Sequence, residues 1–248
     1  MNKNINKPQT QHLSDLAWPK LPAGNRIRYI WQEWLQNHLE AYHGGCLLTF
    51  DSLTQCLSLP ENVFEHCVKL GQGSRHDVIG DIEALPFMTD SLSSIILSHG
   101  FEYCDNPSIV LGEVYRSLAP QGKLYSLLYA PFNPWFLQGK LGLSTSKKQL
   151  PLHQLSLTRY KDWLNLLGFR TLEIEAIGCP WWKGYETFQK KSDMKKAWLS
   201  APIAYMIKAE KKVSTMTPIK PLQEKLAEAM EPGLANVSTQ VSNYQIKQ

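Results

Sequence analysis

Two polar side chains that could contact a ligand follow predicted strands in the middle of the chain. Asp81 comes just after the segment 76–79, and His99 comes directly after Ser94–Ser98 (SIILS). An imidazole titrates near neutrality, so His99 is a candidate general base, although it could equally serve only as a pocket wall. If both runs are strands of one parallel sheet, their carboxyl ends meet at the edge where open α/β sheets bind ligands.

Short apolar runs alternate with amphipathic segments through the chain. Strands are predicted at 46–50, 63–70, 76–79, 94–98 and 123–129, and two late strands at 169–176 and 202–209 are expected to pair antiparallel. Helices are predicted at 25–43, ended by Gly44 and Gly45, and at 108–118 and 157–167, the last ended by Gly168. This alternation predicts an α/β fold with a mostly parallel sheet covered by helices on both faces.

Composition and length favour one domain with polar ends. The 248 residues suit a single α/β domain at 21–212, with a loop-rich cap at 131–155, a flexible arm at 1–20 and a disordered tail at 213–248. The N-terminus lacks the apolar core of a secretory signal, and no apolar run is long enough to span a membrane. Five cysteines without a CxxC pair indicate reduced thiols in a cytoplasmic protein and no zinc site.

Residues 80–130 carry a family resemblance. The segment begins GDIEALPF, continues through a buried run to DNPSIVLGEVYRSLAPQG, and ends in another apolar run. This order and spacing resemble the class I, S-adenosylmethionine (SAM)-dependent methyltransferases grouped as methyltransferase type 11. The resemblance implies a Rossmann-like sheet and SAM as the cofactor. It also implies that the Asp81 carboxylate accepts a hydrogen bond from the adenine amino group, while the backbone of Ile82 pairs with the adjacent ring nitrogen. The plainer alternative is that Asp81 only caps a turn.

The resemblance assigns further residues to the cofactor and the methyl acceptor. It places Ser98 and His99 beside the sulfonium and Phe101 at the substrate entrance. Phe132 and Trp135 lie in an FNPW segment that is similar to a small bacterial subgroup, and they suit an aromatic cap over a substrate or, alternatively, a packed connector. Methyl transfer depends mainly on alignment, since the sulfonium is a good leaving group, so the lack of a catalytic triad is no objection.

The first cofactor motif of the family is missing. In place of a glycine-rich turn after the first strand, the chain has no glycine between Gly45 and Gly71. Asp51 and Ser52 are therefore the candidates that replace the glycine-rich contacts. Gly71-Gln72-Gly73 is rejected as that motif because about ten residues separate it from Asp81, too few for a full crossover. The short link 51–62 also predicts a stunted first helix.

Three functions follow from these features. The first is direct methyl transfer from SAM to a small molecule, which the aromatic cap favours. The second is a catalytically inactive methyltransferase-like protein that binds a partner, which the missing glycines favour. The third, ranked lower, is an RNA methyltransferase, because residues 183–212 hold eight lysines against three acidic residues.

Overall fold

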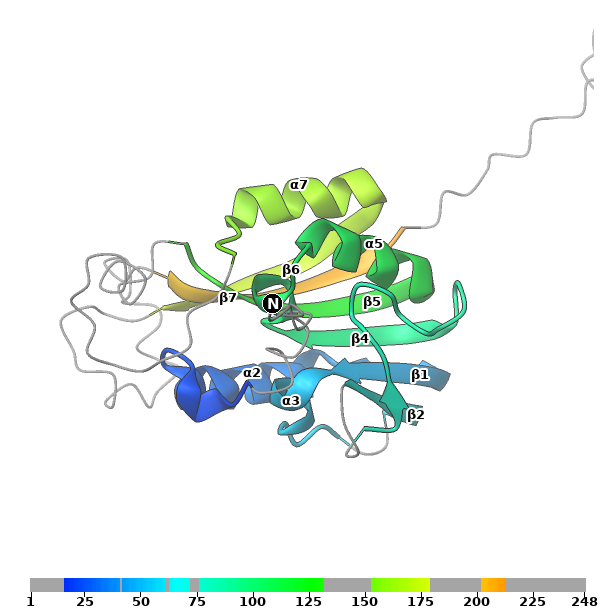
Figure 1. Cartoon of the computed structure of the whole chain (residues 1–248), viewed down its shortest axis with the longest axis horizontal. Helices are drawn as coiled ribbons and strands as arrows, with labels where there is room; N and C mark the ends of the chain where they lie inside the picture. The colour runs from blue at the N-terminus through cyan, green and yellow to red at the C-terminus, as the bar shows by residue number, and fades with distance from the viewer. Residues whose placement is uncertain are drawn as a thin grey trace, which may run out of the picture. The chain divides into compact units, whose positions relative to one another are not determined.

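Seven strands form one sheet in the order β3-β2-β1-β4-β5-β7-β6 (Figure 1). Strands β1 to β5 pair parallel, and β7 pairs antiparallel with both β5 and β6, as the late strands were predicted to do. The strands are β1 Tyr42–Phe50, β2 Phe64–Gly71, β3 Val78–Ile79, β4 Leu92–Ser98, β5 Leu118–Tyr129, β6 Phe169–Gly178 and β7 Pro202–Lys211.

The structure is a computed structural model that describes residues 16–40, 42–60, 63–71, 76–131, 153–178 and 202–212. All of these residues belong to one compact unit, Met1–Val213, and Ser214–Gln248 form a second unit outside the described part. The predicted tail, most of the predicted cap and the two aromatic residues Phe132 and Trp135 therefore lie outside the described residues.

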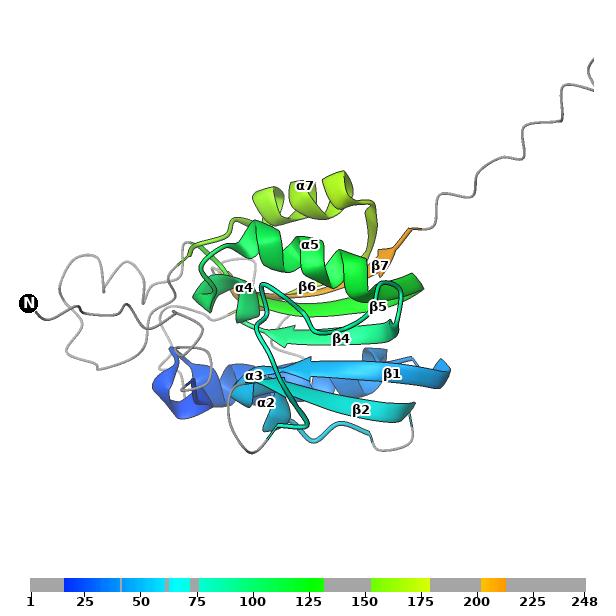
Figure 2. The ribbon, with the colours of Figure 1, turned by 45° about the vertical axis from the view of Figure 1, so that its right-hand side comes forward.

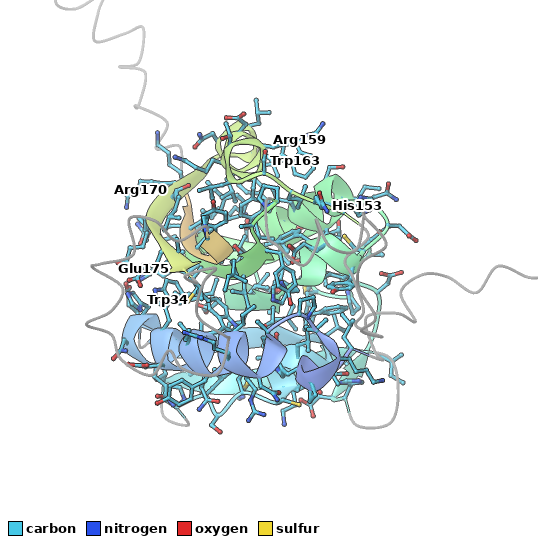
Figure 3. All side chains as sticks on the ribbon, turned by 90° about the vertical axis from the view of Figure 1, so that its left-hand side faces the viewer. Trp34, His153, Arg159, Trp163, Arg170 and Glu175 are labelled. Carbon is cyan, nitrogen blue, oxygen red and sulfur yellow. The ribbon has the colours of Figure 1, made fainter. Side chains whose placement is uncertain are left out.

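Helices cover the sheet on both faces, as predicted (Figures 1 and 2). Helices α5 and α7 lie on one face and α2 lies on the other; Figure 3 shows Trp34 on α2 and Arg159 and Trp163 on α7 at opposite sides of the sheet. The helical segments are η1 Trp18–Lys20, α2 Gly24–His38, α3 Asp51–Gln55, α4 Gly100–Tyr103, α5 Pro107–Ser117 and α7 Leu157–Leu167.

Helix α2 ends earlier than its apolar periodicity predicts. The prediction that Gly44 and Gly45 end this helix is wrong, because both glycines lie within β1. The helix stops at His38, and the next residue, Leu39, is already extended with a ψ of 116°. The two tryptophans of this helix, Trp31 and Trp34, are buried in the core as expected.

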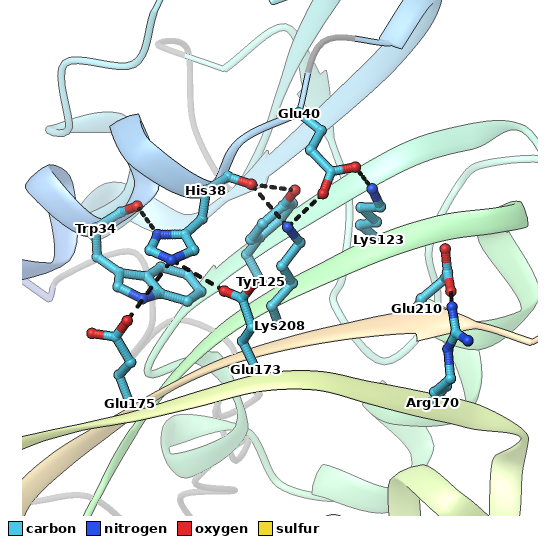
Figure 4. Close-up of polar contacts among 10 residues, drawn as sticks. All are labelled: Trp34, His38, Glu40, Lys123, Tyr125, Arg170, Glu173, Glu175, Lys208 and Glu210. Atoms are coloured by element: carbon cyan, nitrogen blue, oxygen red, sulfur yellow. Dashed lines mark hydrogen bonds and ion pairs between the residues drawn. The ribbon is translucent and has the colours of Figure 1, made fainter.

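The end of α2 is fixed to the sheet by charged contacts (Figure 4). Glu40 pairs with Lys123 of β5 and, at 2.7 Å, with Lys208 of β7. His38 Nε2 lies 3.1 Å from a carboxylate oxygen of Glu173 on β6. Burial lowers the pKa of Lys123, and the nearby Lys208 lowers it further. These contacts hold α2 against the half of the sheet that follows β4.

The first crossover is shortened, as the sequence predicts. Helix α3 has five residues, and only residues 72–77 separate β2 from β3. A crossover helix of ordinary length does not fit in either link. The carboxyl ends of β1 and β2 are therefore lined by short connections, while the carboxyl end of β4 leads into α4 and α5.

Candidate functional site

The topology places a ligand site between β1 and β4. The chain builds β1, β2 and β3 outward in one direction and then continues on the other side of β1 with β4 and β5. Open α/β sheets bind ligands outside the carboxyl ends of the strands at such a switch point. The candidate site is therefore bordered by Phe50, which ends β1, and by Ser98, which ends β4.

Asp81 lies in a tight turn two residues after β3, at the same edge. Its Oδ1 accepts the backbone N–H of Glu83 at 3.0 Å, and its carbonyl accepts the N–H of Ala84 at 3.2 Å. The described residues give its other carboxylate oxygen no partner, and they give the backbone N–H of Ile82 no acceptor. The turn thus has one hydrogen-bond acceptor and one donor without partners on neighbouring residues, and Ile82, main chain included, is fully buried.

The segment after this turn is held against α5. Glu83 accepts the backbone N–H of the residue before α5 at 2.7 Å. Arg116 donates to the carbonyls of Phe87 at 2.8 Å and Leu85 at 2.9 Å, and it pairs with Glu113. Glu113 in turn accepts the N–H of Leu85 at 3.0 Å. The hydrogen bonds from Arg116 hold the pKa of Glu113 below its ordinary value. Three charged residues of the family-like segment therefore position the Asp81 turn.

Ser98 has its hydroxyl in the core between two elements. Its Oγ accepts from Trp31 Nε1 at 3.0 Å and from Thr54 Oγ1 at 2.9 Å, and the residue is fully buried. The hydroxyl therefore joins α2 and α3 to the end of β4. A contact between Ser98 and a ligand, as the resemblance implies, has to come from the backbone.

His99 adopts a strained backbone and is fully buried. Its φ is +63°, and its Nδ1 lies 2.6 Å from Oε2 of Glu102. The other oxygen of Glu102 accepts the N–H of Tyr129 at 2.5 Å, and the Tyr129 ring stacks on the imidazole at 4.1 Å. Burial raises the pKa of Glu102, while His99 acts in the opposite direction. Nε2 of His99 has no hydrogen-bond partner among the described residues.

Glu102 is a residue of the site that the sequence alone does not identify. Its position three residues after His99 was a signal, because α4 is otherwise apolar or aromatic there. The contact that matters most joins Glu102 to Tyr129, which lies 27 positions away. This hydrogen bond forms only because β4 and β5 are neighbours in the sheet, and the sequence does not state which strands are neighbours.

Trp18 lies across the switch point. Its indole N–H donates to the carbonyl of Leu53 in α3 at 2.9 Å, and its ring meets the ring of His99 edge-on at 6.1 Å. Leu16 and Trp18 are both buried, so the boundary predicted at residue 20 falls inside the packed domain. Phe50, also buried, ends β1 directly before α3, the segment that follows the first strand in place of a glycine-rich turn.

The residues present fit one end of SAM better than the other. At the adenine end, the acceptor of Asp81 and the donor of Ile82 complement an amino group beside a ring nitrogen. At the amino acid end, no glycine backbone replaces the family's turn, and Ser52 is half-buried within α3, whose Asp51 side chain lies outside the described residues. The cofactor roles of Asp51 and Ser52 stay predictions.

Two other groups of predicted residues lie apart from this edge. Phe101 is buried and its ring packs at 5.3 Å against Tyr160 of α7, so it faces the core. Among the lysines of 183–212 that the structure describes, Lys208 pairs with Glu40, and Lys211 pairs with Asp90 at 2.6 Å. These two lysines serve internal contacts.

The described residues contain no group of His, Cys, Asp or Glu side chains that could hold a metal ion. No described helix is long and apolar enough to cross a membrane.

The chain matches known methyltransferases in sequence. Residues 54–126 match a family model described as a methyltransferase domain. The uncharacterized protein YafS of Escherichia coli is 29% identical over 179 residues, which cover 70% of this chain and 73% of YafS. The 2-methyl-6-phytyl-1,4-hydroquinone methyltransferase of Arabidopsis thaliana is 30% identical over 107 residues, 43% of this chain but only 30% of that protein.

Solved structures share the fold. The geranyl diphosphate C-methyltransferase of Streptomyces coelicolor superposes with a TM-score of 0.53 at 11% identity, over 75% of this chain and 81% of that one. The [4+2]-cyclase SpnF superposes with a TM-score of 0.51 at 14% identity, over 81% and 85%. The fold is that of the class I, SAM-dependent methyltransferases. The match to the methyltransferase-domain model spans residues 54–126, which hold Asp81, His99 and Arg116.

Proposed function

We propose that this protein binds SAM at the carboxyl edge of its sheet and transfers the methyl group to a small molecule. The observation that supports this most is the turn at Asp81, where a carboxylate oxygen and the N–H of Ile82 stand next to each other without partners among the described residues. Arg116 and Glu113 hold the segment that follows, so the pair is presented from a fixed backbone.

The chain would act mainly by positioning. SAM, when bound, supplies an electrophilic methyl group on a sulfonium. Alignment of two reactants contributes roughly 7–11 kcal/mol to such a step, and this domain offers a rigid sheet edge for it. The names of relatives that methylate a hydroquinone or a prenyl diphosphate support a small-molecule acceptor. Phe132 and Trp135 stay the predicted substrate contacts, whereas Phe101 packs into the core and is no longer proposed as one. A cytoplasmic location belongs to the same proposal.

Calorimetric titration with SAM and with S-adenosylhomocysteine (SAH) tests the proposal. Both ligands should bind in the micromolar range. Asp81→Ala should weaken binding about tenfold, the effect of one lost hydrogen bond of about 1.4 kcal/mol. Asp90→Asn is the matched control, because this residue lies before β4 at the opposite edge and should leave the affinity unchanged.

The alternatives give different results in the same experiment. A folded protein that releases no heat with either ligand supports the catalytically inactive, partner-binding alternative and overturns the proposal. Binding of RNA that is tight and lost in salt would favour the RNA methyltransferase instead. Equal affinity in the Asp81→Ala and Asp90→Asn proteins would show that the adenine site lies elsewhere.

A further inference from the structure

We infer that His99 is the base that takes a proton from the methyl acceptor, that Glu102 is its positioning residue, and that the acceptor carries a phenolic hydroxyl. This inference rests on the proposed function and deepens it. It starts from one residue at the carboxyl end of β4, beside the switch point, that combines an unfavourable backbone with an unpaired buried nitrogen.

Two costs coincide at His99. A φ of +63° is uncommon for a residue with a side chain, and such strain persists only where the surrounding structure imposes it. A buried polar atom without a partner costs about 1–3 kcal/mol, and native structures contain few of them. Nε2 of His99 is such an atom among the described residues. A proton donor on a bound ligand would satisfy it.

Glu102 determines which nitrogen is basic. Oε1 of Glu102 accepts the main-chain N–H of Tyr129, a group that can only donate. Oε2 faces Nδ1 of His99 at 2.6 Å, so an ionised carboxylate here takes the N–H of Nδ1 and leaves the lone pair on Nε2. When Nε2 gains a proton, the resulting imidazolium lies beside the carboxylate, which stabilises the positive charge.

The surroundings of the imidazole are aromatic. Tyr129 stacks on one side at 4.1 Å, and Trp18 meets the ring edge-on at 6.1 Å. The hydroxyl of Tyr129 donates to the carbonyl of Pro22, and burial raises the pKa of Tyr129 well above its ordinary value, so this hydroxyl stays neutral. Flat aromatic neighbours of this kind suit a flat aromatic acceptor.

The proton and the electrons balance in one step. The hydroxyl proton of the phenol moves to Nε2 of His99. The electron pair freed on the acceptor, at oxygen or at a ring carbon conjugated with it, forms the bond to the methyl carbon. The pair of the broken carbon–sulfur bond stays on sulfur, and SAH leaves as a neutral thioether. Attack through a ring carbon ends with the loss of that carbon's proton to water, which restores the ring.

The test uses 4-nitrophenol as the acceptor probe, because its anion absorbs visible light. The probe is titrated with pH in the presence of SAH-saturated protein. In the wild type, bound probe should ionise about one pH unit lower than in solution, which is about tenfold more anion at a given acidic pH. His99→Gln should abolish the shift. Glu102→Gln should shrink it, whereas the control His66→Gln, an exposed residue, should retain it.

The outcomes separate this inference from the proposed function. If SAH binds but the wild-type protein does not shift the ionisation of the probe, or His99→Gln shifts it equally, the inference fails alone. If Glu102→Gln shows the full shift, Glu102 is not a positioning residue. Failure of SAH to bind contradicts the proposed function instead. A wild-type protein that binds SAH but shifts nothing overturns the inference even if a variant does not fold.

Discussion

Replacement of Arg116 by alanine should lower the free energy of unfolding more than most substitutions of partly exposed residues in this domain. The guanidinium makes four hydrogen bonds of 2.8–3.0 Å, two to the carbonyls of Leu85 and Phe87 and two to the carboxylate of Glu113. The bonds to the carbonyls contribute about 1 kcal/mol each, and the partly exposed ion pair adds about 0.5–1 kcal/mol. The expected loss in the free energy of unfolding is therefore about 2.5–3 kcal/mol.

Urea denaturation of Arg116→Ala and of Arg170→Ala measures this loss against a matched control. Arg170 also pairs with a glutamate, Glu210 at 2.5 Å, but its side chain is 65% exposed and has no backbone partner among the described residues. Its loss should cost at most about 0.5 kcal/mol. Arg116→Lys should lose an intermediate amount of stability, because lysine keeps the positive charge but lacks the planar guanidinium that donates several hydrogen bonds at once.

The same variants connect stability to the site. If Arg116 holds the segment after the Asp81 turn, Arg116→Ala should also weaken SAH binding, while Arg170→Ala should not. A free energy of unfolding for Arg116→Ala within about 0.5 kcal/mol of that for Arg170→Ala would refute the reasoning. It would mean that the turn is fixed by packing rather than by these hydrogen bonds.

Two further outcomes are expected. Trp31→Phe should lower the free energy of unfolding by about 1–2 kcal/mol more than Trp34→Phe does. Both substitutions remove the same ring volume, but only the indole N–H of Trp31 donates a hydrogen bond among the described residues, whereas that of Trp34 is buried without a partner. Equal losses of stability in urea denaturation would contradict this. Because the pKa of Glu113 is lowered in the folded state, it stabilises the protein above its ordinary value of 4.5 and loses this effect as pH falls through the lowered pKa. The difference between wild type and Glu113→Gln should therefore shrink in acid, and a difference that is constant from pH 7 to pH 3 would count against the contact.

The sheet could be predicted from the sequence because its strands are short apolar runs separated by helical periods. The run Ser94–Ser98 lies within a strand that is buried throughout, and helix α7 has the predicted bounds. Helix ends were harder to predict. Glycines 44 and 45 resemble a helix terminus, but Tyr42 already pairs with Phe64 of β2, so both glycines lie within β1. Pairing between strands therefore overrides a local signal.

The site could be predicted only in part, for a related reason. Asp81 and His99 are visible in the sequence because each follows an apolar run. Glu102 and Trp18 are not, because their roles depend on partners 27 and 35 residues away. Trp18 was assigned to a flexible arm on composition alone, which carries no information about the hydrogen bond it makes to Leu53.

The family-like segment contains two kinds of residue, and they carry different weight for function. Glu83, Glu113 and Arg116 make backbone contacts within the domain, so their presence is explained by the fold and would persist in an inactive relative. Asp81 also has a structural role, because its Oδ1 accepts the N–H of Glu83, but its other oxygen and Nε2 of His99 have no partner among the described residues. A domain kept only for its architecture would need neither of these two atoms. The case for an active enzyme therefore depends on these two atoms and on what binds them.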